Sequence, residues 1–181
     1  VYYESAPHLK FSLLVQLLQQ ETSKLVMVFS NTRRNADFVS KNLKFSGIDA
    51  MAIHGGFSQN KRTNTMDQFT QSHKTFVLVC TDIAARGLDI KEVSHVYNYD
   101  IPKDSKDYIH RVGRTARAGK EGKAISILSN KDYENFRSIS KDESLIIIPE
   151  ELPEFQIIKL QKDFVQNRKN NWFSGRWKQK N

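Results

Sequence analysis

The chain has 181 residues, of which 39% are apolar, and its 28 basic and 20 acidic side chains give a net charge of +8 at pH 7. This is an ordinary globular composition, and the chain is long enough for one domain with a buried core. No apolar run of about 18 residues occurs, so the sequence predicts no membrane span, and its first residues predict no signal peptide.

The first fifty residues predict an extended lead-in followed by a helix, a strand and a second helix. Residues 1–6 form the lead-in, and Pro7 can open a helix because its fixed φ suits the first turn. Leucines at helical spacing give that helix an apolar face: Leu9, Leu13, Leu14, Leu17 and Leu18. The apolar run 25–29 predicts a strand buried on both faces. A helix over 33–45 follows, and Gly47 ends it.

The same alternation of strands and helices continues to residue 140. The predicted strands are 50–53, 76–80, 95–99 and 123–128, and the predicted helices are 58–71, 104–118 and 131–140. The single cysteine, Cys80, ends one of the apolar runs, which favours a core side chain over a reactive thiol. It cannot form an internal disulfide, and this indicates a reducing, intracellular compartment.

The order of the elements predicts an α/β fold, a parallel sheet flanked by helices on both faces in three layers. In such sheets, ligands bind outside the carboxyl ends of the strands. Four polar stretches follow predicted strands and are expected to meet at that edge: 30–32, 54–56, 81–89 and 100–107.

The last part of the chain differs in composition. Residues 146–153 predict a boundary between a domain at 1–145 and a basic C-terminal extension at 146–181, in which 155–165 have one weak helical face. From residue 156 onward, seven basic side chains against one acidic one place +6 of the net charge here. Aromatic residues among them suit single-stranded nucleic acid, whose bases stack and whose phosphates pair. A solvated tail whose tryptophans pack on the domain explains the pattern equally well.

A dense basic motif lies in the predicted helix 104–118, which has a capping-box-like start and a glycine after its end. Its arginines stand three residues apart, at Arg111, Arg114 and Arg117. Residues three or four apart are neighbours on a helix, so His110, Arg114 and Arg117 share one side. Two guanidinium groups aimed the same way suit a polyphosphate. The alternative is a solvated basic face on an ordinary helix.

Four motifs of the chain resemble those of the DEAD-box RNA helicases. They stand in that family's order and spacing, within a resemblance that covers residues 1 to about 145: 28–32, 54–62, 81–89 and 110–119. The last of them reads His-Arg-Val-Gly-Arg-Thr-Ala-Arg-Ala-Gly, and related helicase families usually carry glutamine in place of His110. One departure is Ala116, where glycine is commoner, but alanine is small and a better helix former.

The resemblance implies the second of two RecA-like domains of an ATP-dependent RNA helicase. The first domain would hold a phosphate-binding loop and an Asp-Glu-Ala-Asp sequence, and this chain contains neither. The chain would therefore supply half of an ATP site and half of an RNA groove, with the N-terminal RecA-like domain of the same protein as its partner. ATP would bind with Mg²⁺, held mainly by that partner domain. A monomer is expected, and the chain alone is expected not to hydrolyse ATP.

The resemblance also assigns roles in the nucleotide site. Arg114 and Arg117 resemble arginine fingers, which reach the γ-phosphate across the domain cleft. His110 resembles the residue that links the nucleotide to the RNA side, or else it is a satisfied polar histidine on the helix. Asp89 resembles the carboxylate that accepts from the ribose hydroxyls, or else it forms a turn after Gly87.

The resemblance places the RNA backbone against six further residues: Thr32, Gly56, Gln59, Arg62, Thr81 and Gly87. Small residues let the main chain approach phosphates, and hydroxyl and amide groups donate to them, without reading bases. Thr32 can equally be a helix cap, and Gly56 part of a plain turn. Two rival functions stay open, namely a non-catalytic RNA-binding or scaffold module and a DNA-directed helicase.

Overall fold

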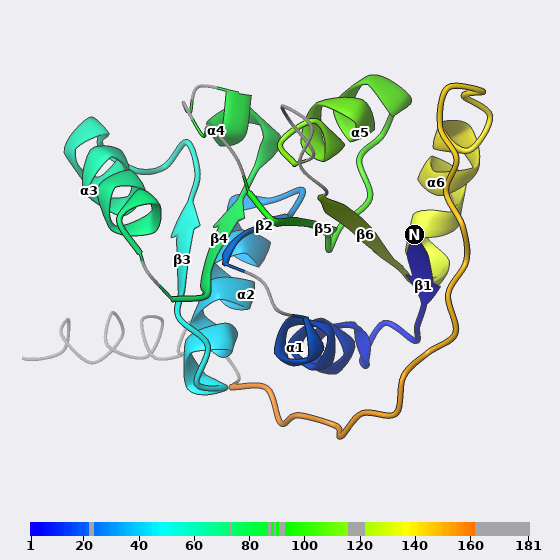
Figure 1. Cartoon of the computed structure of the whole chain (residues 1–181), viewed down its shortest axis with the longest axis horizontal. Coiled ribbons are helices and arrows are strands. Elements are labelled where there is room, and N and C mark those ends of the chain that lie inside the picture. The colour runs from blue at the N-terminus through cyan, green and yellow to red at the C-terminus, as the bar shows by residue number, and fades with distance from the viewer. Residues whose placement is uncertain are drawn as a thin grey trace, which may run out of the picture.

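Six short strands form a single parallel sheet in the part of the chain that the computed structural model describes (Figure 1). That part comprises residues 1–21, 24–72, 74–86, 88, 90, 93–115 and 122–161. The strands lie side by side in the order β1-β6-β5-β2-β4-β3. Their bounds are β1 Tyr2–Glu4, β2 Leu25–Phe29, β3 Ala50–Ile53, β4 Phe76–Cys80, β5 His95–Asn98 and β6 Lys123–Leu128.

Helices cover both faces of this sheet (Figure 1). Their bounds are α1 Lys10–Gln20, α2 Arg33–Phe45, α3 Gln59–Thr70, α4 Asp82–Arg86, α5 Ser105–Val112 and α6 Tyr133–Ile139, with a 3₁₀ turn η1 at Asn130–Asp132. The apolar sides of α1 and α2 pack on one face, whereas α3 and α4 pack on the other. A smaller cluster joins α5, α6 and the end of β6. None of the helices in the described part of the chain has both the length and the apolarity needed to cross a membrane.

This architecture confirms the predicted fold class. The central strands are buried on both faces, which is why they read as unbroken apolar runs in the sequence. Cys80 is fully buried at the end of β4, and burial raises the pKa of its thiol. The prediction of a core cysteine is therefore confirmed.

Two short elements go beyond the sequence prediction. Part of the extended lead-in joins the sheet, because Tyr2–Glu4 pairs in parallel with β6. Residues 82–86 form α4, where the sequence predicted only a polar stretch. A helix this short shows no periodicity, and burial of Ala84 and Ala85 against the sheet stabilises it.

The predicted helix over 104–118 is wrong at its end, since α5 stops at Val112 with Gly113 as its C-cap. The reason lies in Thr115, whose hydroxyl donates to the carbonyl groups of Val93 at 2.8 Å and Ser94 at 3.2 Å. Because these bonds hold Thr115 against the residues before β5, the chain leaves the helical path after Val112. Arg114 therefore lies just beyond the helix and not within it.

The predicted helical face near 155–165 is also wrong for the residues that the structure describes. Residues 146–161, here called the strap, run without regular helix along the domain. The strap pairs with β1 through Tyr2, which donates to the Ile148 carbonyl at 2.9 Å and accepts from the Glu150 amide at 2.8 Å. Farther on, the Ile158 amide donates to Ser12 on α1 at 2.9 Å. These distant contacts replace the local bonds of a helix, and the division at 145/146 stays a prediction.

Candidate functional site

Polar side chains gather where the inner strands end. Ser30 follows β2, Thr81 follows β4, and Asp100 comes shortly after β5. Because these strands are parallel, their carboxyl ends meet at one edge of the sheet. Ligands bind at this edge in α/β proteins, so it is the candidate functional site.

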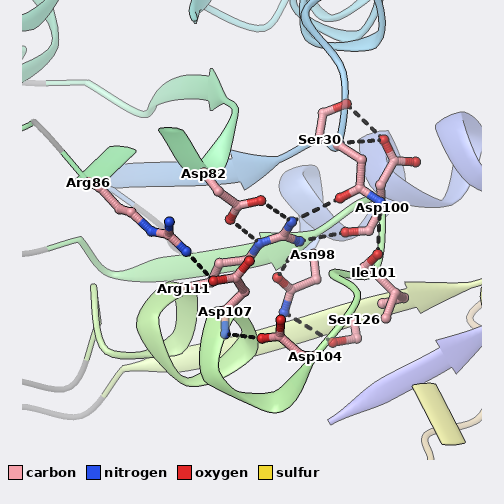
Figure 2. Close-up of polar contacts among 11 residues, drawn as sticks. Ser30, Asp82, Arg86, Asn98, Asp100, Ile101, Asp104, Asp107, Arg111 and Ser126 are labelled. Atoms are coloured by element: carbon pink, nitrogen blue, oxygen red, sulfur yellow. Dashed lines mark hydrogen bonds and ion pairs between the residues drawn. The ribbon is translucent and has the colours of Figure 1, made fainter. Parts of the chain in front are cut away.

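Arg111 lies at the centre of a buried network at this edge (Figure 2). Its side chain is 1% exposed and grips the two carboxylate oxygens of Asp82, through Nε and Nη2 at 2.7 Å each. Nη1 donates to the Asn98 side chain at 3.2 Å and to the Asp100 carbonyl at 2.6 Å, and Nη2 donates to Asn31 at 2.9 Å. A guanidinium has five N–H donors. All of them are engaged, so Arg111 has none left for a ligand.

The Asp100 carboxylate extends this network to the start of α2 (Figure 2). Its Oδ2 accepts from the Ser30 hydroxyl at 2.8 Å, the Asn31 amide at 3.0 Å and the Asn35 side chain at 2.6 Å. The turn before α2 is thereby tied to the end of β5 and, through Arg111, to α5.

Tyr108 attaches α5 to the sheet. Its buried hydroxyl shares a hydrogen bond of 3.1 Å with Ser126 on β6, and Asn98 donates to the same Ser126 oxygen at 3.2 Å. Burial raises the pKa of Tyr108, so its phenol stays neutral and can donate. The helix is held to the sheet by both Tyr108 and Arg111, which lie three residues apart on its inner side.

His110 and Arg114 line a small pocket between α4 and α5. The other lining residues are Phe29, Asp82, Ala85, Arg86, Asp107 and Arg111. An ion pair between Arg86 and Asp107 joins the two helices beside it (Figure 2). His110 is exposed and Arg114 is half-buried. The two nucleotide-site candidates that the structure describes therefore lie together at the open edge.

The backbone of Arg114 is fixed by a hydrogen bond to the segment before β5. Its carbonyl accepts from the Val93 amide at 3.2 Å, next to the hydrogen bonds of the Thr115 hydroxyl. Within the described residues, no side-chain hydrogen bond or ion pair occupies the Arg114 guanidinium. Arg117 and Asp89 lie outside the described residues. The finger roles of Arg114 and Arg117 and the ribose contact of Asp89 stay predictions.

The RNA candidates of the β3–α3 connection and of α3 lie along the same edge. Gln59 is exposed at the first turn of α3, and the turn before it contains Gly56. Arg62 reaches from α3 to the Ala84 carbonyl of α4 at 3.5 Å, and its buried Nε has no hydrogen-bond partner in the described structure. Thr81 is largely buried between β4 and α4. Gly87, the sixth candidate, lies outside the described residues.

Thr32 is the N-cap of α2. Its backbone is extended, and its hydroxyl oxygen accepts from the Asn35 amide at 3.1 Å. This geometry satisfies one of the amide groups that a helix start leaves unpaired. The capping alternative is thus confirmed, whereas a contact between Thr32 and RNA stays a prediction.

Thr32→Ala should lower the free energy of unfolding by about 1 kcal/mol, because the first turn of α2 loses its cap. Thr32→Asp should keep the stability of the wild type, since a carboxylate caps equally well and suits the positive end of the helix dipole. Urea denaturation of the three chains measures both effects. Equal stability of the alanine variant would contradict the capping role.

The sequence interpretation did not assign roles to the residues of the Arg111 network. A signal for Arg111 was present, because it follows Tyr108 by three residues and so shares the inward face of α5. No comparable signal marked Asp82 and Asn98 as its partners, because they come from separate segments of the chain. The described residues contain no group of three or more His, Cys, Asp or Glu side chains that could hold a metal ion.

The chain was compared with known proteins. A family model described as the helicase conserved C-terminal domain matches residues 9–119. The ATP-dependent rRNA helicase RRP3 of Kluyveromyces lactis is 50% identical over 126 residues, which are 70% of this chain and 26% of that protein. The ATP-dependent RNA helicase CshA of Listeria monocytogenes is 46% identical over 132 residues, which are 73% of this chain and 25% of that protein. The chain thus spans about a quarter of the length of these relatives.

Solved structures agree with this match. The E. coli DEAD-box protein SrmB, solved with the regulator of ribonuclease activity A, superposes with a TM-score of 0.78 and 34% identity, covering 87% of this chain and 95% of that one. The C-terminal domain of the DEAD-box protein Dbp5 has a TM-score of 0.74 and 31% identity, covering 82% of this chain and 87% of that one. The fold, the four motifs and these matches agree: the chain belongs to the DEAD-box RNA helicases, as their C-terminal RecA-like helicase domain.

Proposed function

We propose that the full-length protein is an ATP-dependent RNA helicase in which this chain is the second of two RecA-like domains. The observation that carries the proposal is the contrast between two neighbouring arginines. All N–H donors of Arg111 are engaged inside the domain, whereas the Arg114 guanidinium, beside His110 at the carboxyl edge of the sheet, has no partner among the described residues. The relatives named as ATP-dependent RNA helicases support the same activity.

In this proposal, Arg114 and Arg117 are arginine fingers for a nucleotide held mainly by the N-terminal RecA-like domain. Fixed cations stabilise the charge that develops on a transferring phosphoryl group. Asp89 accepts hydrogen bonds from the ribose, and His110 connects the nucleotide side to the RNA side. The Mg²⁺ that accompanies ATP is held mainly by the N-terminal domain, so this chain contributes cations and hydrogen bonds.

The RNA backbone runs along the same edge of the domain. Its contacts are Thr32, Gly56, Gln59, Arg62, Thr81 and Gly87. Arg62 supports this path, because its side chain reaches from α3 to the Ala84 carbonyl of α4 at this edge. Contacts of this kind reach phosphates and sugars, so binding is largely independent of sequence.

The motor works by closure of two domains. ATP and RNA together draw the domains shut, which brings Arg114 and Arg117 to the phosphates and bends the bound strand. A bent strand cannot stay paired with its complement, so short duplexes separate locally. Hydrolysis and phosphate release then reopen the cleft. The protein acts as an intracellular monomer in this proposal.

The test is RNA-stimulated ATP hydrolysis and strand separation by the full-length protein. We expect RNA to stimulate turnover, a short RNA duplex to be separated in preference to a DNA duplex of the same sequence, and the chain alone to do neither. Equal separation of the DNA duplex would indicate a DNA-directed helicase. RNA binding without any ATP turnover would indicate a non-catalytic RNA-binding module.

A further inference from the structure

The turn between β3 and α3 is organised around a buried histidine. His54 is 6% exposed, and its two ring nitrogens are both engaged. Nε2 lies 3.0 Å from Oδ1 of Asp37 on α2, and Nδ1 accepts from the Gly56 amide at 3.2 Å. An acceptor Nδ1 must carry no proton, so the ring is neutral with its hydrogen on Nε2, donated to Asp37.

This histidine also explains why residue 56 is glycine. The only described glycine with a positive φ is Gly47, so backbone strain does not demand glycine in this turn. A Cβ atom on Gly56 would instead meet Nδ1 of His54 at 3.1 Å and Cε1 at 3.2 Å. The ring cannot readily give way, because Asp37 holds one end and the Phe57 ring packs at 4.3 Å between centroids. The side-chain position of residue 56 therefore faces the histidine.

The turn carries the predicted RNA contacts into α3. The Phe57 amide donates to the His54 carbonyl at 3.1 Å and closes the turn, and Ser58 then caps α3. Gln59 and Arg62 lie in the first turns of that helix. The bond between the Gly56 amide and His54 thus lies within the turn that leads into α3.

We propose that His54 is a positioning residue for RNA binding: its neutral ring, oriented by Asp37, holds the Gly56 amide and so sets the placement of Gly56, Gln59 and Arg62 against the RNA backbone. This rests on the proposed function. The charged groups around the turn are Asp37 and Arg33 on α2 and Lys61 on α3.

Two substitutions separate the two bonds of the ring. The side-chain oxygen of His54→Asn takes the place of Nδ1 and can accept from Gly56, but the variant cannot reach Asp37. The side-chain amide of His54→Gln takes the place of Nε2 and can donate to Asp37, but nothing accepts from Gly56. Each variant loses one hydrogen bond, so similar losses of thermal stability are expected, and a difference in RNA affinity cannot be ascribed to unfolding.

The experiment measures binding of a fluorescein-labelled single-stranded oligouridine RNA of about 15 nucleotides to the full-length protein, with a non-hydrolysable ATP analogue. At about pH 8, His54→Gln should bind about five- to tenfold more weakly than His54→Asn, which should bind close to wild type. His8→Asn, a matched change at an exposed histidine, should bind RNA as the wild type does.

The outcomes distinguish this inference from the proposed function. A wild-type protein that binds no RNA would overturn the proposed function, and the positioning role with it. A wild-type protein that binds RNA, with His54→Gln equal to it in affinity, would overturn the positioning role alone. NMR of the histidine ring nitrogens gives a readout independent of RNA, and a proton found on Nδ1 at neutral pH would also overturn it.

Discussion

Arg111→Met should lower the free energy of unfolding of this chain by about 3–5 kcal/mol, because it removes one partner of a buried ion pair and leaves the other in place. The guanidinium is 1% exposed, and Asp82, which it grips at 2.7 Å, is 23% exposed. The Asn98 side chain and the Asp100 carbonyl lose a donor as well. Each buried polar group left unpaired costs about 1–3 kcal/mol. Urea denaturation followed by circular dichroism measures the change.

Three further variants test the cause of this loss. Arg111→Lys should also destabilise, since an ammonium cannot span two carboxylate oxygens and cannot fill the remaining acceptors. Arg111→Met combined with Asp82→Leu should recover part of the stability, because no uncompensated charge remains. Arg137→Met, at an exposed position of α6, should stay within about 0.5 kcal/mol of wild type. An Arg111→Met chain as stable as that control would contradict the structural role of the network.

The sequence predicted the fold wherever one element's own pattern decides its structure. The strands β2 and β4 are continuous apolar runs because helices cover both faces of the sheet. The predictions that were wrong concern two segments whose structure depends on contacts with residues distant in the sequence. Hydrogen bonds from the Thr115 hydroxyl to the carbonyl groups of residues 93–94 end α5. Backbone pairing with Tyr2 and a hydrogen bond to Ser12 hold the strap extended. Local periodicity contains no information about such partners.

The candidate site shows the same limit. Spacing alone predicted that arginines would share a helix side, but it could not separate the buried Arg111 from the accessible Arg114. The difference arises because α5 ends between them, at Gly113. Similarly, the resemblance implies that Gly56 lets RNA approach, which stays a prediction, and the structure adds that a Cβ atom there would meet the His54 ring. Both features depend on which neighbour a side-chain position faces, and this is known only from the folded structure.

Arg114→Ala in the full-length protein should lower RNA-stimulated ATP turnover by on the order of 10³–10⁵-fold, the range found for arginine fingers of other nucleotide hydrolases. The structure gives this residue a fixed backbone, through the bond between its carbonyl and the Val93 amide at 3.2 Å, and leaves its guanidinium without an internal partner among the described residues. Loss of the side chain therefore breaks no hydrogen bond or ion pair among the described residues. Unfolding stability should change by less than about 0.5 kcal/mol.

The division of this effect between kcat and KM identifies its origin. A finger acts on charge that exists only in the transition state, so kcat should fall while the KM for ATP changes little. Arg114→Lys keeps the charge but loses the planar fork, and it should restore only part of the turnover. Arg137→Ala, equally basic but exposed on α6, should leave kcat unchanged. Near-normal turnover in Arg114→Ala would refute the finger role. A rise in KM at constant kcat would instead mean that Arg114 binds the ground-state nucleotide, with the transition-state charge stabilised elsewhere.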